Sequence, residues 1–223
     1  AGISAESGLP TFRDANGLWE GHRVEEVATP QAFEHDPETV LRFYNLRRAA
    51  LATVQPNAAH LAIARLQRDY PGQVTLITQN VDDLHERGGS ADVIHMHGTL
   101  LNSLCSHCRA TSPWPGDMRT SDVCTTCGET GTLRPDIVWF GEMPYHMEAI
   151  ETALASVDLF VAIGTSGHVH PAAGFVAMAR YAGAGTLEIN NAGTAVSGSF
   201  ADHRTGPASV EVPVWVDRML AGQ

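Results

Sequence analysis

A short apolar run that ends abruptly in polar residues is the feature that most constrains the fold of this chain. Residues 74–78 read Val-Thr-Leu-Ile-Thr without polar alternation, which is typical of a strand buried on both faces, as in a parallel sheet. The polar residues that follow it are Gln79, Asn80, Asp82 and Asp83. Ligands bind beyond the carboxyl ends of the strands in open α/β sheets, so these side chains are placed to hold one.

Other predicted strands end in the same way. Val93-Ile94 leads into His95, Met96, His97 and Gly98; the strand at 159–163 leads into Gly164, Thr165 and Ser166; and the strand at 186–189 ends in Asn190 and Asn191. A further strand is predicted at 137–140. Helices are predicted at 37–54, 57–69, 82–87, 146–156, 171–182 and from Pro213. Apolar strands that alternate with helices predict an α/β fold, a doubly wound parallel sheet of Rossmann-like type.

The composition narrows the classes of function. The 223 residues carry a formal net charge of −11, and no basic stripe is present, which argues against nucleic acid as the main partner. No apolar run is long enough for a transmembrane segment, and no leader segment is recognisable. We therefore expect a cytoplasmic protein without a membrane partner. Because Ala1-Gly2-Ile3-Ser4 forms a turn with no strand before it, we expect the native chain to start earlier.

All four cysteines lie in two Cys-x-x-Cys pairs, Cys105/Cys108 and Cys124/Cys127. Four thiolates at this spacing suit tetrahedral zinc. The alternative is a pair of disulfides in a secreted protein, but nothing else in the sequence indicates secretion. Four thiolates close the coordination shell, so we expect one structural zinc ion. The surrounding segment, 99–135, lacks helical periodicity and is predicted as an inserted zinc ribbon.

His97 is the candidate general base. An imidazole titrates near neutral pH and can take a proton from a hydroxyl. Alternation along the strand points His95 and His97 to one face, with His95 deeper, and Met96 away from it. The alternative for any one of these polar residues is a structural role at a strand end. Asp82, for example, would then cap the helix that follows it.

The N-terminal segment is a candidate phosphate site. Gly2-Ile3-Ser4-Ala5-Glu6-Ser7-Gly8, followed by Thr11-Phe12-Arg13, contains small residues that let backbone N–H groups approach a pyrophosphate. Arg13 is placed to contact the phosphates or the ribose. The segment lacks the G-x-G-x-x-G pattern, and a plain surface loop within residues 1–19 fits these residues as well.

Together these motifs resemble those of the sirtuins, NAD-dependent protein-lysine deacylases, and most closely the bacterial CobB-type members. The resemblance covers essentially the whole chain, in order, through Gly2–Gly8, Thr11–Arg13, Gln79–Asp82, His97-Gly98, the two cysteine pairs, Trp139–Glu142 and Gly164–Ser166. It implies a Rossmann-like NAD-binding domain from residues 1–28, 55–98 and 136–223, a helical insertion at 29–54 that lines the acyl pocket, and a zinc-binding module at 99–135.

The resemblance also implies roles for individual residues. His97 would act as the general base on a ribose hydroxyl of NAD. Residues that would hold or guard the cofactor are Ala1, Gly2, Ser4, Ala5, Glu6, Thr11, Phe12, Arg13, Trp19, Gln79, Asn80, Asp82, Gly164, Thr165, Ser166, Asn190, Asn191 and Ala208. An acylated-lysine peptide would pair as an added strand with Val138, Phe140, Gly141 and Glu142. The products would be free lysine, nicotinamide and acyl-ADP-ribose.

Helical geometry sets Arg47 apart from the other arginines of its helix. At about 100° per residue, it falls in an apolar arc formed by Val40, Phe43, Tyr44, Leu46, Ala50, Leu51 and Val54, whereas Glu38, Arg42, Asn45 and Arg48 fall opposite. An inward guanidinium needs an anionic partner, because an unpaired buried charge costs about 3–5 kcal/mol. The alternatives are an internal salt bridge and snorkelling to solvent.

Tyr44 and Arg47 share a helix face and are placed to grip a carboxylate. The pair resembles the Tyr-x-x-Arg of sirtuins that remove succinyl and malonyl groups, and Ala28 matches the small residue that leaves room for them. We therefore expect both deacetylation and desuccinylation. The competing hypotheses are a sirtuin-like NAD hydrolase or ADP-ribosyltransferase, which would share the cofactor site, and a non-enzymatic zinc-ribbon protein that binds a partner.

Overall fold

The computed structural model describes residues 2–10 and 22–222. The described helices are α1 (Gly2–Ala5), α2 (Val24–Val27), α3 (Pro30–His35), α4 (Pro37–Leu51), α5 (Ala58–Asp69), α6 (Leu84–Arg87), α7 (Met147–Ala155), α8 (Phe175–Tyr181) and α9 (Ala208–Leu220), with 3₁₀ turns η1 (Ala172–Gly174) and η2 (Ser197–Ser199). The strands are β1 (Ile77–Thr78), β2 (Ile94–His95), β3 (Gly98–Cys105), β4 (Thr111–Pro113), β5 (Leu133–Ile137), β6 (Leu159–Ile163), β7 (Gly185–Asn190) and β8 (Asp202–Thr205). None of these helices is both long and apolar enough to cross a membrane.

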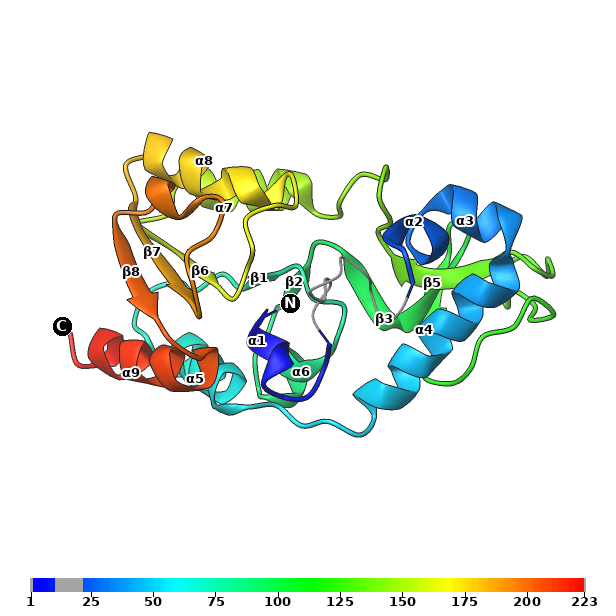
Figure 1. Ribbon diagram of the computed structural model, residues 1–223, viewed down its shortest axis with the longest axis horizontal. Helices are drawn as coiled ribbons and strands as arrows, with labels where there is room; N and C mark the ends of the chain where they lie inside the picture. Colours follow the sequence, from blue (N-terminus) through cyan, green and yellow to red (C-terminus); the bar gives the residue numbers. More distant parts are fainter. Residues whose placement is uncertain (1, 11–21, 223) are drawn as a thin grey trace.

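The elements form an α/β body and a smaller lobe that lie side by side along the longest axis (Figure 1). In the body, β6, β7 and β8 pair in parallel in that order, and β1 pairs in parallel with β2. The expected α/β fold with parallel strands is confirmed.

Helices cover both faces of these strands. Leu159, Val161 and Ile163 of β6 pack in one core with α5 and α9, whereas Phe160 packs in another with α7 and α8. Figure 1 shows the two helical layers below and above the strands. Alternate side chains of one apolar strand thus serve two cores, which is the doubly wound arrangement expected from the sequence.

Several element boundaries differ from the sequence predictions. The strand predicted at 74–78 shortens to β1, because its ladder with β2 covers only two residue pairs. The strand predicted at 137–140 lies earlier, as β5, because it pairs antiparallel with β3 inside the zinc module. Strand β8 was not predicted, since its sequence Asp-His-Arg-Thr has no apolar alternation.

Both ends of the described chain are also more helical than predicted. Gly2–Ala5 forms a helical turn rather than a loop. The last helix begins at Ala208, and Pro213 lies inside it. Pro213 is the sixth residue of this helix, so it has no backbone N–H to donate to the carbonyl of Ser209 four residues earlier.

The smaller lobe contains the antiparallel sheet β4-β3-β5 together with α2, α3 and α4. Strand β3 pairs with β5 from Gly98↔Ile137 to Cys105↔Leu133, with a register shift between Thr99 and Ser103. The first cysteine pair therefore begins at the end of β3. The segment between β3 and β5 contains strand β4 and turns but no helix, as its lack of helical periodicity predicted.

Helix α4 packs into two cores, which corrects the single apolar arc predicted for it. One face joins the core that contains Val40, Phe43, Tyr44, Leu51 and Trp139. A second face meets the zinc module, where Arg48 Nε donates to the Leu100 carbonyl at 2.8 Å and Asn45 Nδ2 donates to the Met118 carbonyl at 2.9 Å. Arg48 is thus buried rather than solvent-facing, and Leu46 is 65% exposed rather than packed.

Candidate active site

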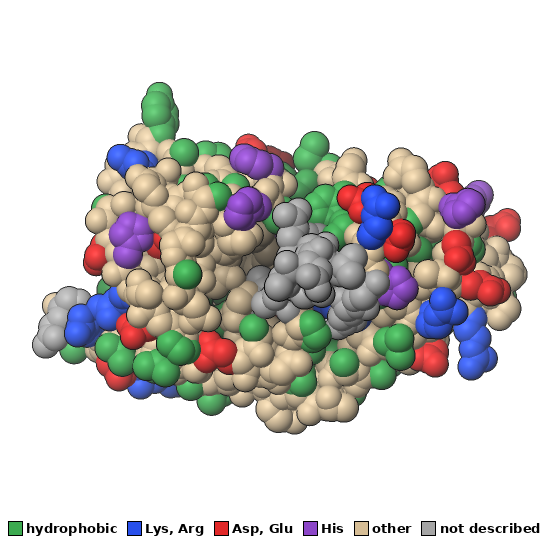
Figure 2. Space-filling view, in the orientation of Figure 1, with side chains coloured by type: hydrophobic (Ala, Val, Ile, Leu, Met, Phe, Trp, Pro, Cys, Tyr) green, Lys and Arg blue, Asp and Glu red, His purple; other side chains and the backbone are tan. Residues whose placement is uncertain are grey.

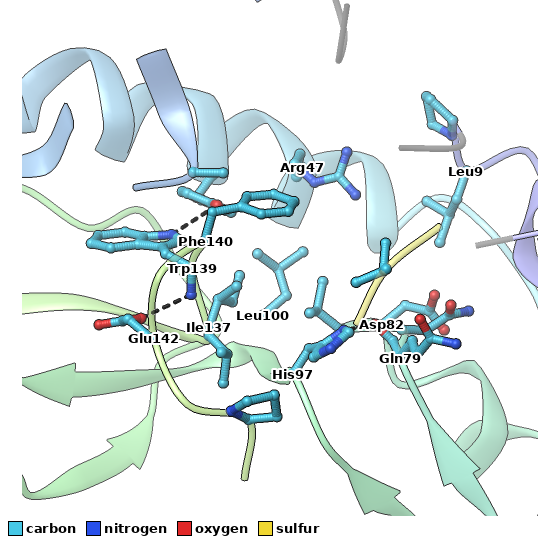
Figure 3. A pocket seen from close by; sticks show the side chains of 18 of the residues that line it. Leu9, Arg47, Gln79, Asp82, His97, Leu100, Ile137, Trp139, Phe140 and Glu142 are labelled. Atoms are coloured by element: carbon cyan, nitrogen blue, oxygen red, sulfur yellow. Dashed lines mark hydrogen bonds between the residues drawn. The ribbon is translucent and has the colours of Figure 1, made fainter. Parts of the chain in front are cut away.

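A cavity of about 240 Å³ is lined by residues of both the α/β body and the smaller lobe. Figure 2 shows the corresponding face hollowed near its centre, and Figure 3 shows the lining side chains. The predicted site residues that line it are Ala28, Tyr44, Arg47, Gln79, Asn80, Asp82, His97, Val138, Phe140, Gly141, Glu142, Thr165 and Ser166. The fold therefore brings the predicted base, part of the cofactor set and the whole substrate set to one place.

His97 lies just beyond β2, with its Nδ1 3.1 Å from the carbonyl oxygen of Gln79. A carbonyl only accepts, so we assign the ring proton to Nδ1 and the lone pair to Nε2. Burial lowers the pKa of His97 from its ordinary value, which keeps the ring neutral near pH 7. Figure 3 shows His97 in the cavity beside Gln79 and Asp82. The imidazole is therefore prepared to accept a proton at Nε2.

The loop from Gln79 to Asp82 is held by bonds to neighbouring elements. Gln79 Nε2 donates to Thr165 Oγ1 at 3.2 Å, and Asn80 Nδ2 donates to Ser4 Oγ at 2.8 Å. Asp82 Oδ1 accepts from the backbone N–H of Leu84 at 3.2 Å. Asp82 thus lines the cavity and also supports the start of α6.

A close backbone approach joins α1 to the end of β6. The N–H of Gly2 donates to the carbonyl of Gly164 at 2.8 Å. A Cβ built on Gly2 would lie 2.6 Å from that oxygen, so only glycine fits. Asn190 Nδ2 donates to the carbonyl of Thr165 at 2.7 Å. Three segments far apart in the sequence thus meet at the carboxyl edge of the strands, as the nucleotide-site hypothesis requires.

Among the described residues, the other predicted cofactor residues do not line the cavity. Gly2, Ser4, Ala5, Glu6, Gly164, Asn190, Asn191 and Ala208 are absent from its wall. The Glu6 carboxylate accepts hydrogen bonds from the backbone N–H and the hydroxyl of Ser209, in the first turn of α9. Ala1, Thr11, Phe12, Arg13 and Trp19 lie outside the described residues. The site has glycines in close backbone contact, and it has amide and hydroxyl donors at three strand ends. These groups suit a dinucleotide.

Tyr44 and Arg47 enter the cavity from the same face of α4. The hydroxyl of Tyr44 accepts a bond from Trp139 Nε1 at 2.9 Å, and burial raises the pKa of Tyr44, so the phenol stays protonated. The Arg47 guanidinium lies 5.7 Å from the Phe43 ring centroid. Figure 3 shows Arg47 directed into the cavity from α4, with His97 on the other side of it. A neutral hydroxyl and a cation thus share an otherwise largely apolar wall.

The segment 138–142 crosses from the zinc module to the α/β body. The N–H of Val138 donates to the carbonyl of His97 at 2.9 Å, and that of Phe140 donates to the carbonyl of Ala28 at 3.0 Å. The Glu142 carboxylate pairs with Arg134 Nη1 at 2.7 Å and Nη2 at 2.8 Å, and it also accepts from the backbone N–H of Trp139. Glu142 lines the cavity, but its oxygens are engaged in fixing this turn.

Sequence reasoning did not include Trp139 among the site residues. The Arg134 guanidinium carbon lies 3.4 Å from the Trp139 ring centroid, and the indole N–H donates to Tyr44. Its position inside the Trp139–Glu142 motif was the available signal. Apolar wall residues such as Leu9, Val81, Leu100, Ile137 and Val169 were also missed, because nothing in a sequence distinguishes a cavity wall from a core.

The four cysteines form a separate centre. Their sulfur atoms all lie within 4.8 Å of one another, and Cys105–Cys127 and Cys108–Cys124 Sγ separations are both 3.8 Å. A tetrahedron with Zn–S bonds of about 2.3 Å has edges of about 3.8 Å. The cysteines are free rather than paired as disulfides, so the disulfide alternative is wrong. The donor set fits one structural zinc ion without an open position.

Comparisons with known proteins agree with this geometry. The model of the Sir2 family matches residues 1–171. The chain is 55% identical to an NAD-dependent protein deacylase of Vibrio cholerae, over all of this chain and 92% of that one. It is 54% identical to an NAD-dependent protein deacylase of Escherichia coli K12, over all of this chain and 80% of that one.

Solved structures give the same result. A Sir2 homologue in complex with NAD superposes with a TM-score of 0.91 at 38% identity, covering all of this chain and 87% of that one. A Sir2 variant in complex with a deacetylated p53 peptide and 3′-O-acetyl ADP ribose superposes with a TM-score of 0.83 at 25% identity, covering all of this chain and 90% of that one.

Proposed function

The chain belongs to the Sir2 family, and from this premise we propose that, as an NAD-dependent protein deacylase, it removes acetyl groups and also succinyl or malonyl groups from lysine side chains. The observation that carries the wider acyl range is the placement of Tyr44 and Arg47 in the same cavity as His97. We also propose the division into an NAD-binding domain of residues 1–28, 55–98 and 136–223, a helical insertion at 29–54 and a zinc module at 99–135, and action in the cytoplasm.

The strand ends provide the cofactor site of this proposal. Gln79, Asn80 and Asp82 would hold the nicotinamide and its ribose, while Thr165, Ser166 and Asn190 would take the phosphate and adenosine half. Bound NAD would supply a ribose carbon that accepts the acyl oxygen as nicotinamide leaves. With one water consumed to break the amide bond to lysine, the products would be lysine, nicotinamide and acyl-ADP-ribose.

His97 would take a proton at Nε2 from a ribose hydroxyl. The bond from Nδ1 to the Gln79 carbonyl supports this role, because it fixes the tautomer and the orientation of the ring. The pKa of His97, lowered by burial, leaves the Nε2 lone pair available at neutral pH. A base held this way typically accelerates the step it serves by about 10²–10⁴-fold.

Arg47 and Tyr44 would select the acyl group. A guanidinium binds a carboxylate through two parallel hydrogen bonds, and the neutral Tyr44 hydroxyl adds a third contact. Trp139 supports this arrangement because its indole N–H fixes the position of the Tyr44 oxygen. Ala28 keeps the nearby wall small, which leaves room for an acyl chain longer than acetyl.

The backbone of 138–141 would receive the acylated-lysine peptide as an added strand. The bonds from Val138 to His97 and from Phe140 to Ala28 anchor this segment to both sides of the cavity. Phe140 is 43% exposed, so its ring is accessible to a bound peptide. Glu142 would act by holding the turn through Arg134 rather than by touching the peptide.

Nicotinamide release tests the proposal and its competitors. We expect release that requires a peptide and occurs with both acetyl-lysine and succinyl-lysine peptides of one sequence. Equal release without a peptide would indicate an NAD hydrolase, and peptide-independent labelling of an acceptor would indicate an ADP-ribosyltransferase. No release under any condition would leave only a binding function.

A further inference from the structure

Two histidines at the end of β2, His95 in the strand and His97 just beyond it, bond to the carbonyls of two consecutive loop residues. His97 Nδ1 lies 3.1 Å from the Gln79 carbonyl oxygen, and His95 Nδ1 lies 3.2 Å from the Asn80 carbonyl oxygen. The two rings differ in their second nitrogen. That of His95 lies 2.6 Å from Glu86 Oε1 on α6, whereas His97 lines the cavity.

The partners of His95 determine its charge. A carbonyl oxygen and a carboxylate oxygen both accept hydrogen bonds, so a ring that bonds to both must carry protons on both nitrogens. The result is an imidazolium paired with Glu86, although only 11% of the His95 side chain is exposed. Burial opposes this charge, but the hydrogen bond and charge of Glu86 raise the pKa of His95 overall.

We propose that the His95–Glu86 ion pair is a positioning device that fixes the Asn80 carbonyl, and with it the loop from Gln79 to Asp82, only while His95 is protonated. His95 does not line the cavity, so it acts through the loop rather than by touching substrate. The inference rests on the proposed function, because that function assigns the loop residues to the nicotinamide and its ribose.

The direction of the pH effect follows from the raised pKa. The His95–Glu86 ion pair is intact below the pKa of His95 and is lost as the pH rises through that pKa. The neutral His95 ring keeps one proton, and it lies on Nε2 because the Glu86 carboxylate is the stronger acceptor. Nδ1 then presents a lone pair to the Asn80 carbonyl oxygen, and the hydrogen bond between them is lost. The pKa of His97 is lowered instead, so His97 sets the acid limb of activity and His95 sets the alkaline limb.

Other charged groups around His95 adjust this balance without reversing it. Asp82, in the loop, favours the imidazolium. His85, on α6 beside Glu86, opposes a second positive charge. His60 meets His85 edge to face with ring centroids 4.9 Å apart, and burial lowers the pKa of His60 to about 4, so His60 is neutral throughout the relevant range.

The first test is the pH profile of kcat/KM for NAD with one acetyl-lysine peptide, for wild type, Glu86→Gln and His95→Gln. We expect kcat/KM of the wild type to fall about 2- to 10-fold across the alkaline limb, which corresponds to the loss of one hydrogen bond. Glu86→Gln should move the alkaline limb to lower pH, because it removes the charge that holds the proton. His95→Gln should remove that limb and leave the acid limb in place. Glu148→Gln, an exposed acid on α7, is the matched control and should leave both limbs unchanged.

The second test does not depend on activity. The ring nitrogens of His95, followed by NMR without NAD, should titrate above the ordinary histidine pKa in wild type and at lower pH in Glu86→Gln. The inference is overturned if the His95 titration or the alkaline limb is unchanged in Glu86→Gln, a surface change that does not threaten folding. Failure of the proposed function has a different signature, since wild type would then release no nicotinamide at any pH.

Discussion

Strand β3 contributes residues to both the zinc centre and the active-site cavity, but the two sites are assembled in different ways. The four cysteines lie between residues 105 and 127, and their sulfur atoms cluster within 4.8 Å of one another. The cavity wall draws residues from Leu9 to His170, out of both the body and the smaller lobe. One centre is therefore fixed by local spacing, whereas the other exists only when the whole chain has folded.

The two regions also differ in how their polar groups are used. Four thiolates on one zinc ion leave no coordination position for a substrate, so that centre can only stabilise. In the cavity, side chains are oriented by hydrogen bonds to other parts of the protein. His97 Nδ1 lies 3.1 Å from the Gln79 carbonyl oxygen, and the Tyr44 hydroxyl accepts from the Trp139 indole N–H. Orientation in advance is what catalysis requires of a group.

The largest expected effect is at the zinc centre. Cys124→Ala removes one of the four ligands, and zinc binding contributes directly to folding free energy, about 10–16 kcal/mol in small zinc-finger peptides. We expect loss of zinc, a lower Tm, poor solubility and loss of all deacylation. Elemental analysis and thermal unfolding measure this, with the exposed Thr126→Ala in the same knuckle as control. Full activity and an unchanged Tm in zinc-free protein would contradict a structural metal.

His97→Ala should do the reverse and remove activity without removing structure. We expect deacylation to fall by about 10²–10⁴-fold, with zinc content and Tm little changed. In wild type, activity should fall as the pH drops through the lowered pKa of His97, below the ordinary value of 6.5. Initial rates against pH measure both effects, and the exposed His35→Ala is the control. A variant with half of the wild-type turnover would remove His97 from the mechanism.

The same contrast explains how much could be predicted from the sequence. The Cys-x-x-Cys spacing alone placed the metal centre, because its ligands are neighbours along the chain. The bounds of the strand 159–163 and the helix starts after Asp36 and Pro56 were also predicted, although four of the five residues of that strand are only partly buried. Their causes are local, namely an apolar run and two capping signals: Asp36 accepts from Thr39 N–H, and Asn57 accepts from Ala59 N–H.

What the sequence did not reveal depends on packing between distant segments. Arg48 was expected on the outer face of its helix, but the zinc module covers that face and the Leu100 carbonyl binds its Nε. Trp139 becomes a site residue only because Tyr44, on another element, accepts its indole N–H. Sequence periodicity indicates one buried face of a helix. It cannot show that another part of the protein, here the zinc module, covers a second face.

Arg47→Met tests whether the cavity selects acidic acyl groups. The change removes the charge and keeps much of the side-chain volume. We expect kcat/KM for a succinyl-lysine peptide to fall about 10- to 150-fold, the worth of a charge-assisted pair of about 1.5–3 kcal/mol. The acetyl-lysine peptide of the same sequence should change far less. Arg42→Met, exposed on the same helix, is the control. Equal losses for both peptides would make Arg47 structural and the protein a plain deacetylase.

Tyr44→Phe should produce the smallest effect, in the same direction. The phenol is buried and neutral, so its loss removes one hydrogen bond to the acyl carboxylate but no charge. We expect about a 2- to 10-fold fall in kcat/KM for the succinyl peptide and little change for the acetyl peptide. The Trp139 indole N–H also loses its acceptor, which should lower the free energy of unfolding by about 1–3 kcal/mol. Tyr70→Phe, at a residue that packs against another core and does not line the cavity, is the control for removing a tyrosine hydroxyl. If the acetyl and succinyl rates fall together in Tyr44→Phe, the hydroxyl serves only to hold Trp139, and acyl selection rests on Arg47 alone.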